Sequence, residues 1–132
     1  MQYVEHIGIA VRDLEKANDL FARLLGQGPY KIETVESEKV RTSFFRNGET
    51  KIELLESLAP EGPIGKFIEK RGEGIHHIAF AQEGVASALD HARECGVQLI
   101  DQGPRKGAEG LDIGFLHPRS TFGVLMEFCG KD

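Results

Sequence analysis

Two segments of the chain alternate apolar residues with small or polar ones, a pattern typical of a half-buried β-strand. The first is 5–11, EHIGIAV, and the second is 76–81, HHIAFA. Each leads into a stretch whose apolar residues recur three and four positions apart, so we expect an amphipathic helix after each strand. Asp13 is suited to cap the start of the first helix, which is expected to end at Gly26, and the second helix is expected to end at Gly96.

Three more strand-like runs follow each predicted helix, so both halves of the chain are predicted to have the element order β-α-β-β-β. Asn47 and Gly48 form a strong hairpin signal, and we expect them to be the two residues of the turn between the second and third runs of the first half. The six runs are Tyr30–Glu36, Lys39–Arg46 and Glu49–Glu56 in the first half, and Val97–Asp101, Leu111–Leu116 and Phe122–Cys129 in the second.

The shared element order indicates an internal repeat. We expect one domain, 1–132, made of a first module at about 1–58, a joint at about 59–74 and a second module at about 75–130. The joint is rich in glycine and proline and has room for one short helix, Ile64–Arg71. The sequence thus predicts an α+β fold in which two small modules share one core.

Composition narrows the possible partners. The chain has 132 residues, of which 40% are hydrophobic and 28% are charged, an ordinary balance for a globular domain. Its formal net charge of −5 argues against nucleic acid, and no apolar run approaches the roughly 20 residues of a membrane span. The N-terminus lacks a signal-peptide pattern, and Cys95 and Cys129 lie 34 residues apart, unlike a disulfide framework. We therefore expect a reduced, cytoplasmic protein that binds neither nucleic acid nor membranes.

Two histidines and two glutamates occupy equivalent places in the repeat. On each first strand an imidazole, His6 or His77, shares one side with the two small residues that follow it, which is expected to leave open space beside the ring. On each last strand a carboxylate, Glu53 or Glu127, alternates with apolar neighbours that point to the other side. The histidine and the glutamate are 47 residues apart in the first half and 50 in the second.

This recurrence favours a divalent-metal site over four unrelated polar residues. Two imidazoles and two carboxylates suit a borderline or hard divalent ion, and such an ion also removes the cost of burying the carboxylates. Each residue taken alone has a simpler explanation, as a hydrogen-bonded histidine or as a glutamate paired with lysine or arginine. His91, on the second predicted helix, and His117, at a proline-containing turn, are poor ligand candidates.

Several longer motifs together carry a family resemblance that covers nearly the whole chain. They are the segments 5–11, 50–56 (TKIELLE), 72–80 (GEGIHHIAF), 106–110 (KGAEG), 115–118 (FLHP) and 123–127 (GVLME). With them the chain resembles the vicinal oxygen chelate superfamily, which has the glyoxalase/bleomycin-resistance-like fold, and within it the methylmalonyl-CoA epimerase family. The resemblance implies that the two βαβββ modules form an open, cup-shaped mixed sheet around a metal site.

The resemblance also implies an activity and the residues that perform it. The family interconverts (R)- and (S)-methylmalonyl-CoA, a CoA thioester of propionate metabolism, by a 1,1-proton transfer through a metal-stabilised enolate. It implies one divalent metal ion per chain, of the set Co, Mn, Mg, Ni or Zn, and a homodimer. By resemblance, the metal ligands are His6, Glu53, His77 and Glu127. Glu127 is expected to act also as one catalytic acid or base, and Glu53 is a candidate for the other.

The identity of the second acid or base stays open at this point. Some relatives have glutamine in place of Glu53, and some carry a glutamate on the preceding strand, where the predicted turn places Thr42 opposite Glu53. Threonine is not a useful base at neutral pH, so the choices are Glu53 itself, a water on the metal or a group from a loop. Thr42 is expected to face the substrate. Lys106 and Arg119, together with Arg105, are candidates for binding the CoA phosphates.

Three alternative functions are weighed against this reading. Glyoxalase I, acting on a glutathione hemithioacetal, needs a similar ligand set but lacks the sequence context of 106–110 and 116–118. An iron oxygenase with two histidines and one carboxylate would leave Glu53 unbound. A metal-free small-molecule-binding protein of the same fold would have lost the ligand set, which this chain keeps.

Overall fold

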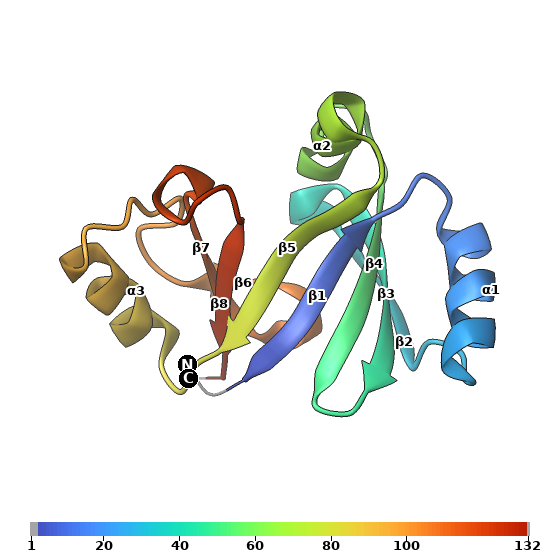
Figure 1. Cartoon of the computed structure of the whole chain (residues 1–132), viewed down its shortest axis with the longest axis horizontal. Helices are drawn as coiled ribbons and strands as arrows, with labels where there is room; N and C mark the ends of the chain where they lie inside the picture. The colour runs from blue at the N-terminus through green and yellow to red at the C-terminus, as the bar shows by residue number, and fades with distance from the viewer. Residues whose placement is uncertain (1–2, 132) are drawn as a thin grey trace. The chain divides into compact units, whose positions relative to one another are not determined.

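The computed structural model describes residues 3–131. Within this range the chain forms eight β-strands and three α-helices, in the order β-α-β-β-β twice with α2 between the two sets (Figure 1). The α+β fold with two βαβββ modules is therefore confirmed. The elements are β1 (Val4–Ala10), α1 (Leu14–Leu25), β2 (Lys31–Val35), β3 (Val40–Asn47), β4 (Thr50–Ser57), α2 (Pro63–Arg71), β5 (Gly74–Ala81), α3 (Val85–Glu94), β6 (Arg105–Lys106), β7 (Asp112–Leu116) and β8 (Met126–Gly130). None of the helices in this described range has the length and apolar character needed to cross a membrane.

The chain divides into two compact units whose boundaries cut through β1 and β5. The N-terminal unit is His6–His76, and the C-terminal unit consists of residues 3–5 with 77–131. Each unit therefore takes a few strand residues from the other half of the sequence. The module boundaries that were expected from the repeat stay a prediction.

The N-terminal unit has the strand order β2-β3-β4-β1. Its strands form a mixed sheet, because β1 runs parallel to β4 while β3 runs antiparallel to both β2 and β4. Helix α1 packs on β3 and β4. It begins and ends as predicted: Asp13 Oδ1 accepts from the Lys16 backbone N–H at 3.1 Å, and Gly26 closes the helix with a φ of 83°. The core beneath α1 is formed by Val11, Leu14, Phe45 and Leu54.

Helix α2 covers the other face of the same strands. Ala10 and Leu55 alternate along β1 and β4 with the residues that lie under α1, so their side chains point to the opposite face. There they form a buried cluster with Val40 and with Ile64 of α2. Ala10, one of the two small residues that follow His6 on this side of β1, is thus itself buried in the packing of α2.

The C-terminal unit has the strand order β5-β8-β7-β6, with the start of β1 beside the end of β5. The Ala81 N–H donates to the Tyr3 carbonyl at 2.9 Å. β5 and β8 are parallel, whereas β7 is antiparallel to both of its neighbours. Helix α3 packs on β7 and β8 (Figure 1). The core between them is formed by Val85, Leu89, Ala92, Leu99, Leu116 and Phe128.

The hairpin between β3 and β4 turns one residue later than predicted. Asn47 pairs with Thr50, so the two turn residues are Gly48 and Glu49. Gly48 has a positive φ of 67°, whereas Glu49 does not have a positive φ, which is the pattern of a type II′ turn. Such a turn takes glycine at its first central position, and the Asn-Gly pair would have suited type I′ instead.

The later turn shifts the register of the two strands by two residues. Phe44, not Thr42, lies opposite Glu53, and Thr42 lies opposite Leu55. The shift keeps every side chain on its predicted face because two residues is the repeat of a strand. Thr42 and Glu53 therefore still share a face, although the predicted pairing between them is wrong.

Two predicted strands of the second half differ in extent. The segment 97–101 is not a strand: Leu99 makes a single bridge to Leu116, and the first strand after α3 is the two-residue β6. The physical reason lies at Asp101, whose carboxylate accepts the Phe115 N–H at 2.9 Å and so replaces a backbone partner. The last strand, β8, starts at Met126 rather than Phe122.

The residues before β8 form a turn instead of a strand. Pro118 begins a short 3₁₀ turn, and its carbonyl accepts from the N–H groups of Thr121 and Gly123. Phe122 has a φ of 58° and a fully exposed side chain. A left-handed backbone cannot continue a strand, so the apolar character of Phe122 was misleading in the sequence.

Candidate functional site

The N-terminal unit holds a buried histidine and glutamate in contact. Parallel pairing of β1 with β4 places Gly8 opposite Glu53, so the backbone at Gly8 carries no side chain beside this carboxylate. His6 Nε2 lies 3.3 Å from Glu53 Oε1, and both side chains are buried. Two of the predicted metal ligands, His6 and Glu53, are thus brought together within one unit.

The second oxygen of Glu53 has a partner from β3. Thr42 Oγ1 donates a hydrogen bond of 2.8 Å to Glu53 Oε2, and Thr42 is fully buried. Phe44, opposite Glu53, turns the edge of its ring toward His6 with 6.5 Å between the ring centroids and 87° between the planes. The contacts of His6 and Thr42 therefore use different oxygens of the same carboxylate.

The C-terminal unit repeats this arrangement. Parallel pairing of β5 with β8 places Ala79 opposite Glu127, as Gly8 is placed opposite Glu53. His77 Nε2 lies 3.2 Å from Glu127 Oε1, and both side chains are buried. Phe115 lies opposite Glu127, and its ring meets that of His77 at 83° with 5.7 Å between the centroids. The other two predicted ligands are thus also neighbours.

Each unit therefore presents the same three side chains from equivalent strands: a histidine on the first strand, a phenylalanine on the third and a glutamate on the last. The sequence analysis identified the histidines and glutamates as site residues but assigned no role in the site to Phe44 or Phe115. A signal was present, since each phenylalanine stands on the strand paired with its glutamate, but using it requires the hairpin register.

The donor set fits a divalent metal ion. Each unit offers an imidazole nitrogen and a carboxylate oxygen, the donors that suit borderline and hard divalent ions. Glu53 and Glu127 are only 5% and 4% exposed, and a nearby cation lowers the large cost of burying a carboxylate.

The predicted substrate-binding cations lie on the C-terminal unit. Lys106 Nζ is 2.6 Å from Asp112 Oδ1. Arg119 is exposed, and its backbone N–H donates to His117 Nδ1 at 3.0 Å. These contacts do not involve His77 or Glu127, so the role of Lys106 and Arg119 in binding a substrate stays a prediction.

Arg105 is connected to the buried pair through the ring of Phe115. Its Nε is 2.9 Å from Asp101 Oδ1, and its guanidinium lies 5.7 Å from the centroid of the Phe115 ring, which in turn contacts His77. His91, which was expected to be a poor metal ligand, is exposed on α3, and its Nε2 lies 3.7 Å from Cys95 Sγ.

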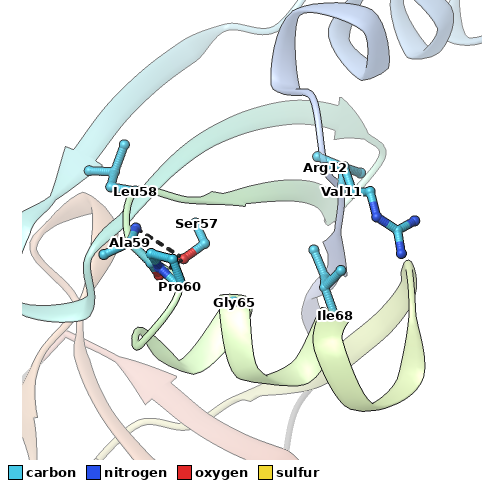
Figure 2. Close-up of a pocket in the computed structure, with 8 residues that line it drawn as sticks. All are labelled: Val11, Arg12, Ser57, Leu58, Ala59, Pro60, Gly65 and Ile68. Carbon is cyan, nitrogen blue, oxygen red and sulfur yellow. Dashed lines mark hydrogen bonds between the residues drawn. The ribbon is translucent and has the colours of Figure 1, made fainter.

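A separate hollow of about 270 Å³ lies in the N-terminal unit beside α2, and none of the predicted site residues lines it. Figure 2 shows Arg12 and Ile68 on one side and Pro60 and Ser57 on the other. The Arg12 guanidinium lies 3.4 Å from Glu73. The hollow is thus a feature of how α2 packs and does not belong to the His–Glu pairs.

Comparison with known proteins indicates the family to which the chain belongs. The family model described as Glyoxalase/Bleomycin resistance protein/Dioxygenase superfamily matches residues 5–115. The chain is 43% identical over 129 residues to the uncharacterized protein YqjC of Bacillus subtilis, covering 98% of this chain and 92% of that protein. It is 36% identical over 126 residues to the ethylmalonyl-CoA/methylmalonyl-CoA epimerase of Cereibacter sphaeroides, covering 94% of each.

Solved structures extend this similarity to three dimensions. A variant of the Streptomyces coelicolor methylmalonyl-CoA epimerase in complex with 2-nitronate-propionyl-CoA matches with a TM-score of 0.94 and 31% identity, covering 99% of this chain and 95% of that one. A methylmalonyl-CoA epimerase in complex with methylmalonyl-CoA and NH4+ matches with the same values. The chain therefore belongs to the glyoxalase/bleomycin resistance protein/dioxygenase superfamily and, within it, to the family of the methylmalonyl-CoA epimerases.

Proposed function

We propose that the chain is a metal-dependent epimerase that interconverts (R)- and (S)-methylmalonyl-CoA by a 1,1-proton transfer. Membership of the epimerase family supports the reaction, and the CoA thioesters held by related structures support the substrate class. The observation that carries the proposal is the pair of buried His–Glu contacts, one in each unit, on equivalent strands of the repeat.

One divalent ion per chain would be held by His6, Glu53, His77 and Glu127. These donor types are compatible with Co, Mn, Mg, Ni or Zn. When bound, the ion supplies Lewis-acid stabilisation of the negative charge that develops on the thioester oxygen as the α-proton leaves. The repeat supports a single shared ion, because each unit alone offers only half of a four-ligand set.

Glu53 and Glu127 are the proposed acid–base groups. A 1,1-proton transfer removes the α-proton from one face of the carbon and returns a proton to the opposite face, so it needs one group for each face. Each module supplies one buried carboxylate on its last strand. Burial limits the access of bulk water to both carboxylates, which favours proton transfer to and from the α-carbon over side reactions with water.

The remaining assignments concern the substrate and the assembly. CoA is polyanionic and the protein carries a net charge of −5, so binding requires local positive charge. We assign this role to Lys106 and Arg119, with Arg105 beside them. Thr42 lies next to Glu53 and so belongs to the proposed substrate-facing side. The family resemblance leads us to expect a homodimer, and the two cysteines, which do not form a disulfide framework, lead us to expect a cytoplasmic protein.

The test is proton exchange at the α-carbon. In heavy water, protein loaded with a divalent ion should incorporate one deuterium at the α position of methylmalonyl-CoA while it interconverts the two epimers, as followed by mass spectrometry. The Glu127→Gln variant should lose at least about a hundredfold in epimerisation rate. The matched control, Glu94→Gln on the exposed side of α3, should keep the wild-type rate.

A parallel incubation with the glutathione hemithioacetal of methylglyoxal tests the glyoxalase I alternative. If the protein converts this adduct and leaves methylmalonyl-CoA unlabelled, the epimerase proposal is wrong.

A further inference from the structure

The two modules share the histidine, the phenylalanine and the glutamate of the candidate site but differ in a residue beside them. Phe44 and Phe115 occupy equivalent places opposite their glutamates. Two residues earlier on the same strands, the N-terminal module has Thr42 and the C-terminal module has Ile113. Thr42 donates a hydrogen bond to its glutamate, whereas the Ile113 side chain has no hydroxyl to donate.

Ile113 instead contributes to the apolar packing of its unit. It lies in a buried cluster with Ala79 and Cys129. An isoleucine at position 42 would therefore be expected to pack as Ile113 does at the equivalent position of the other module. Thr42 is 0% exposed, and a buried hydroxyl without a partner costs free energy, so the 2.8 Å bond to Glu53 offsets the cost of burying this one.

The bond restricts the orientation of the Glu53 carboxylate. The terminal torsion of a glutamate is broad and nearly two-fold, so a carboxylate without such a bond can rotate about it. In Glu53 one oxygen accepts from Thr42 and the other faces His6 Nε2 at 3.3 Å. The hydroxyl therefore fixes the plane of the carboxylate so that the other oxygen is directed toward the histidine.

We infer that Thr42 is a positioning residue that aligns Glu53 both as a metal ligand and as the acid–base group of one face. The alignment of Glu53 as an acid–base group rests on the proposed function, whereas its alignment as a metal ligand rests on geometry alone. It also makes the two carboxylates of the site different from each other, because only the N-terminal module contains this hydroxyl.

Three variants test the inference. Thr42→Val keeps the shape and removes the hydroxyl, and Thr42→Ser restores it. Ser43→Ala is the matched control, because Ser43 is the next residue on β3, is equally buried, and its Oγ has no hydrogen-bond partner among the described residues. Ser43→Ala thus removes a buried hydroxyl from the same strand without touching Glu53.

The first measurement is the affinity of metal-free protein for Co²⁺, by calorimetric titration. Loss of a group that orients a ligand typically weakens metal binding by about ten- to a hundredfold, so Thr42→Val should bind at least about tenfold more weakly. Thr42→Ser should return the affinity to within about threefold of the wild type, and Ser43→Ala should leave it unchanged. Equal affinities of Thr42→Val and wild type would overturn the inference.

The second measurement compares α-proton exchange of the two purified epimers in heavy water at saturating Co²⁺. Thr42→Val should slow epimerisation about tenfold or more in both directions. Exchange without inversion should persist for the epimer whose proton faces Glu127 and fall for the other. A purely structural defect would slow both exchanges alike, and that result would contradict the alignment of Glu53 as an acid–base group.

The two measurements separate failure of the inference from failure of the proposed function. If wild-type protein exchanges no α-proton of methylmalonyl-CoA while Thr42→Val still weakens Co²⁺ binding, the epimerase proposal is wrong and the positioning role of Thr42 is supported. If exchange occurs in the wild type and Thr42→Val changes neither affinity nor the ratio of the two exchange rates, the epimerase stands and the role of Thr42 is wrong.

Discussion

At the scale of single residues, Phe44 and Phe115 limit how the two histidines can move. Each ring meets its imidazole edge-on at an angle above 80°, and each phenylalanine lies opposite the glutamate that the histidine contacts. Each imidazole is therefore in contact with both a phenylalanine ring and a glutamate carboxylate. A ligand held in this way needs little reordering when it binds a metal.

Replacement of one histidine should remove the metal. We expect the purified protein to hold close to one divalent ion per chain and His77→Ala to lose it, because the C-terminal unit would keep only the carboxylate of its pair. His91→Ala is the control, since His91 is exposed on α3 and should leave the metal content unchanged. Elemental analysis by mass spectrometry measures both, and a His77→Ala protein that keeps its full metal content would contradict the ligand assignment.

The candidate ligands were predictable from sequence because strand side chains alternate and because the repeat supplies each residue twice. The neighbours of these ligands were not predictable in the same way. The Thr42–Glu53 hydrogen bond joins residues that are not paired in the ladder, and Phe44 reaches its place through a turn type that depends on the backbone angle at Gly48. The alternation of side chains determines the face of the sheet on which a residue lies. The residue that lies opposite it on the partner strand depends on the turn.

At the scale of elements, α2 is held to the chain that precedes it by a close approach at Gly65. A methyl group at Gly65 would lie 2.7 Å from the Pro60 carbonyl oxygen and 2.8 Å from that of Ala59. Both are backbone atoms that cannot rotate away. The packing of α2, and with it the cover over Ala10 and Leu55, therefore depends on a missing side chain.

Gly65→Ala should destabilise the protein by about 1–3 kcal/mol, the usual cost of forcing extra atoms into a packed contact. Gly28→Ala is the matched control, because a methyl group there meets nothing within 4 Å and the backbone has no positive φ. Gly28→Ala should change the stability by less than about 1 kcal/mol. Urea denaturation followed by circular dichroism gives both values, and equal stabilities of the two variants would contradict the clash.

Element prediction succeeded where local signals agreed with the fold and failed where a side chain took over a backbone role. The ends of α1 followed from Asp13 and Gly26, whose caps need no tertiary contact. The segment 97–101 has the composition of a strand, but the Asp101 carboxylate takes the Phe115 N–H. Phe122 is apolar and exposed because it lies in a turn. Neither role can be recognised from hydrophobic alternation.

At the scale of the whole molecule, the two units are linked through shared strands. β1 (Val4–Ala10) starts in the C-terminal unit and ends in the N-terminal unit, and β5 (Gly74–Ala81) does the reverse. Each of these strands thus has one end in each unit, so the loss of either unit leaves part of a strand without its continuation. A chain built in this way is expected to unfold in one cooperative step.

The two tyrosines allow this to be measured unit by unit, because the chain contains no tryptophan. Tyr3 belongs to the C-terminal unit and Tyr30 to the N-terminal unit. In Tyr30→Phe protein, the urea midpoint from Tyr3 fluorescence should coincide with the midpoint from circular dichroism, and the same should hold for Tyr30 in Tyr3→Phe protein. Separate midpoints in either variant would show that the units unfold independently.

The exchange of strand residues also decides how such proteins can be recombined. A chimera joined within 59–74 would take β1 from one parent and β5 from the other, so both units would receive strand residues from a foreign parent. A graft of the segment 6–76 moves the N-terminal unit as a whole and leaves the C-terminal unit in one parent, with breakpoints inside β1 and β5. Breakpoints at the ends of this segment, rather than at the glycine-rich joint, are the ones that preserve both units.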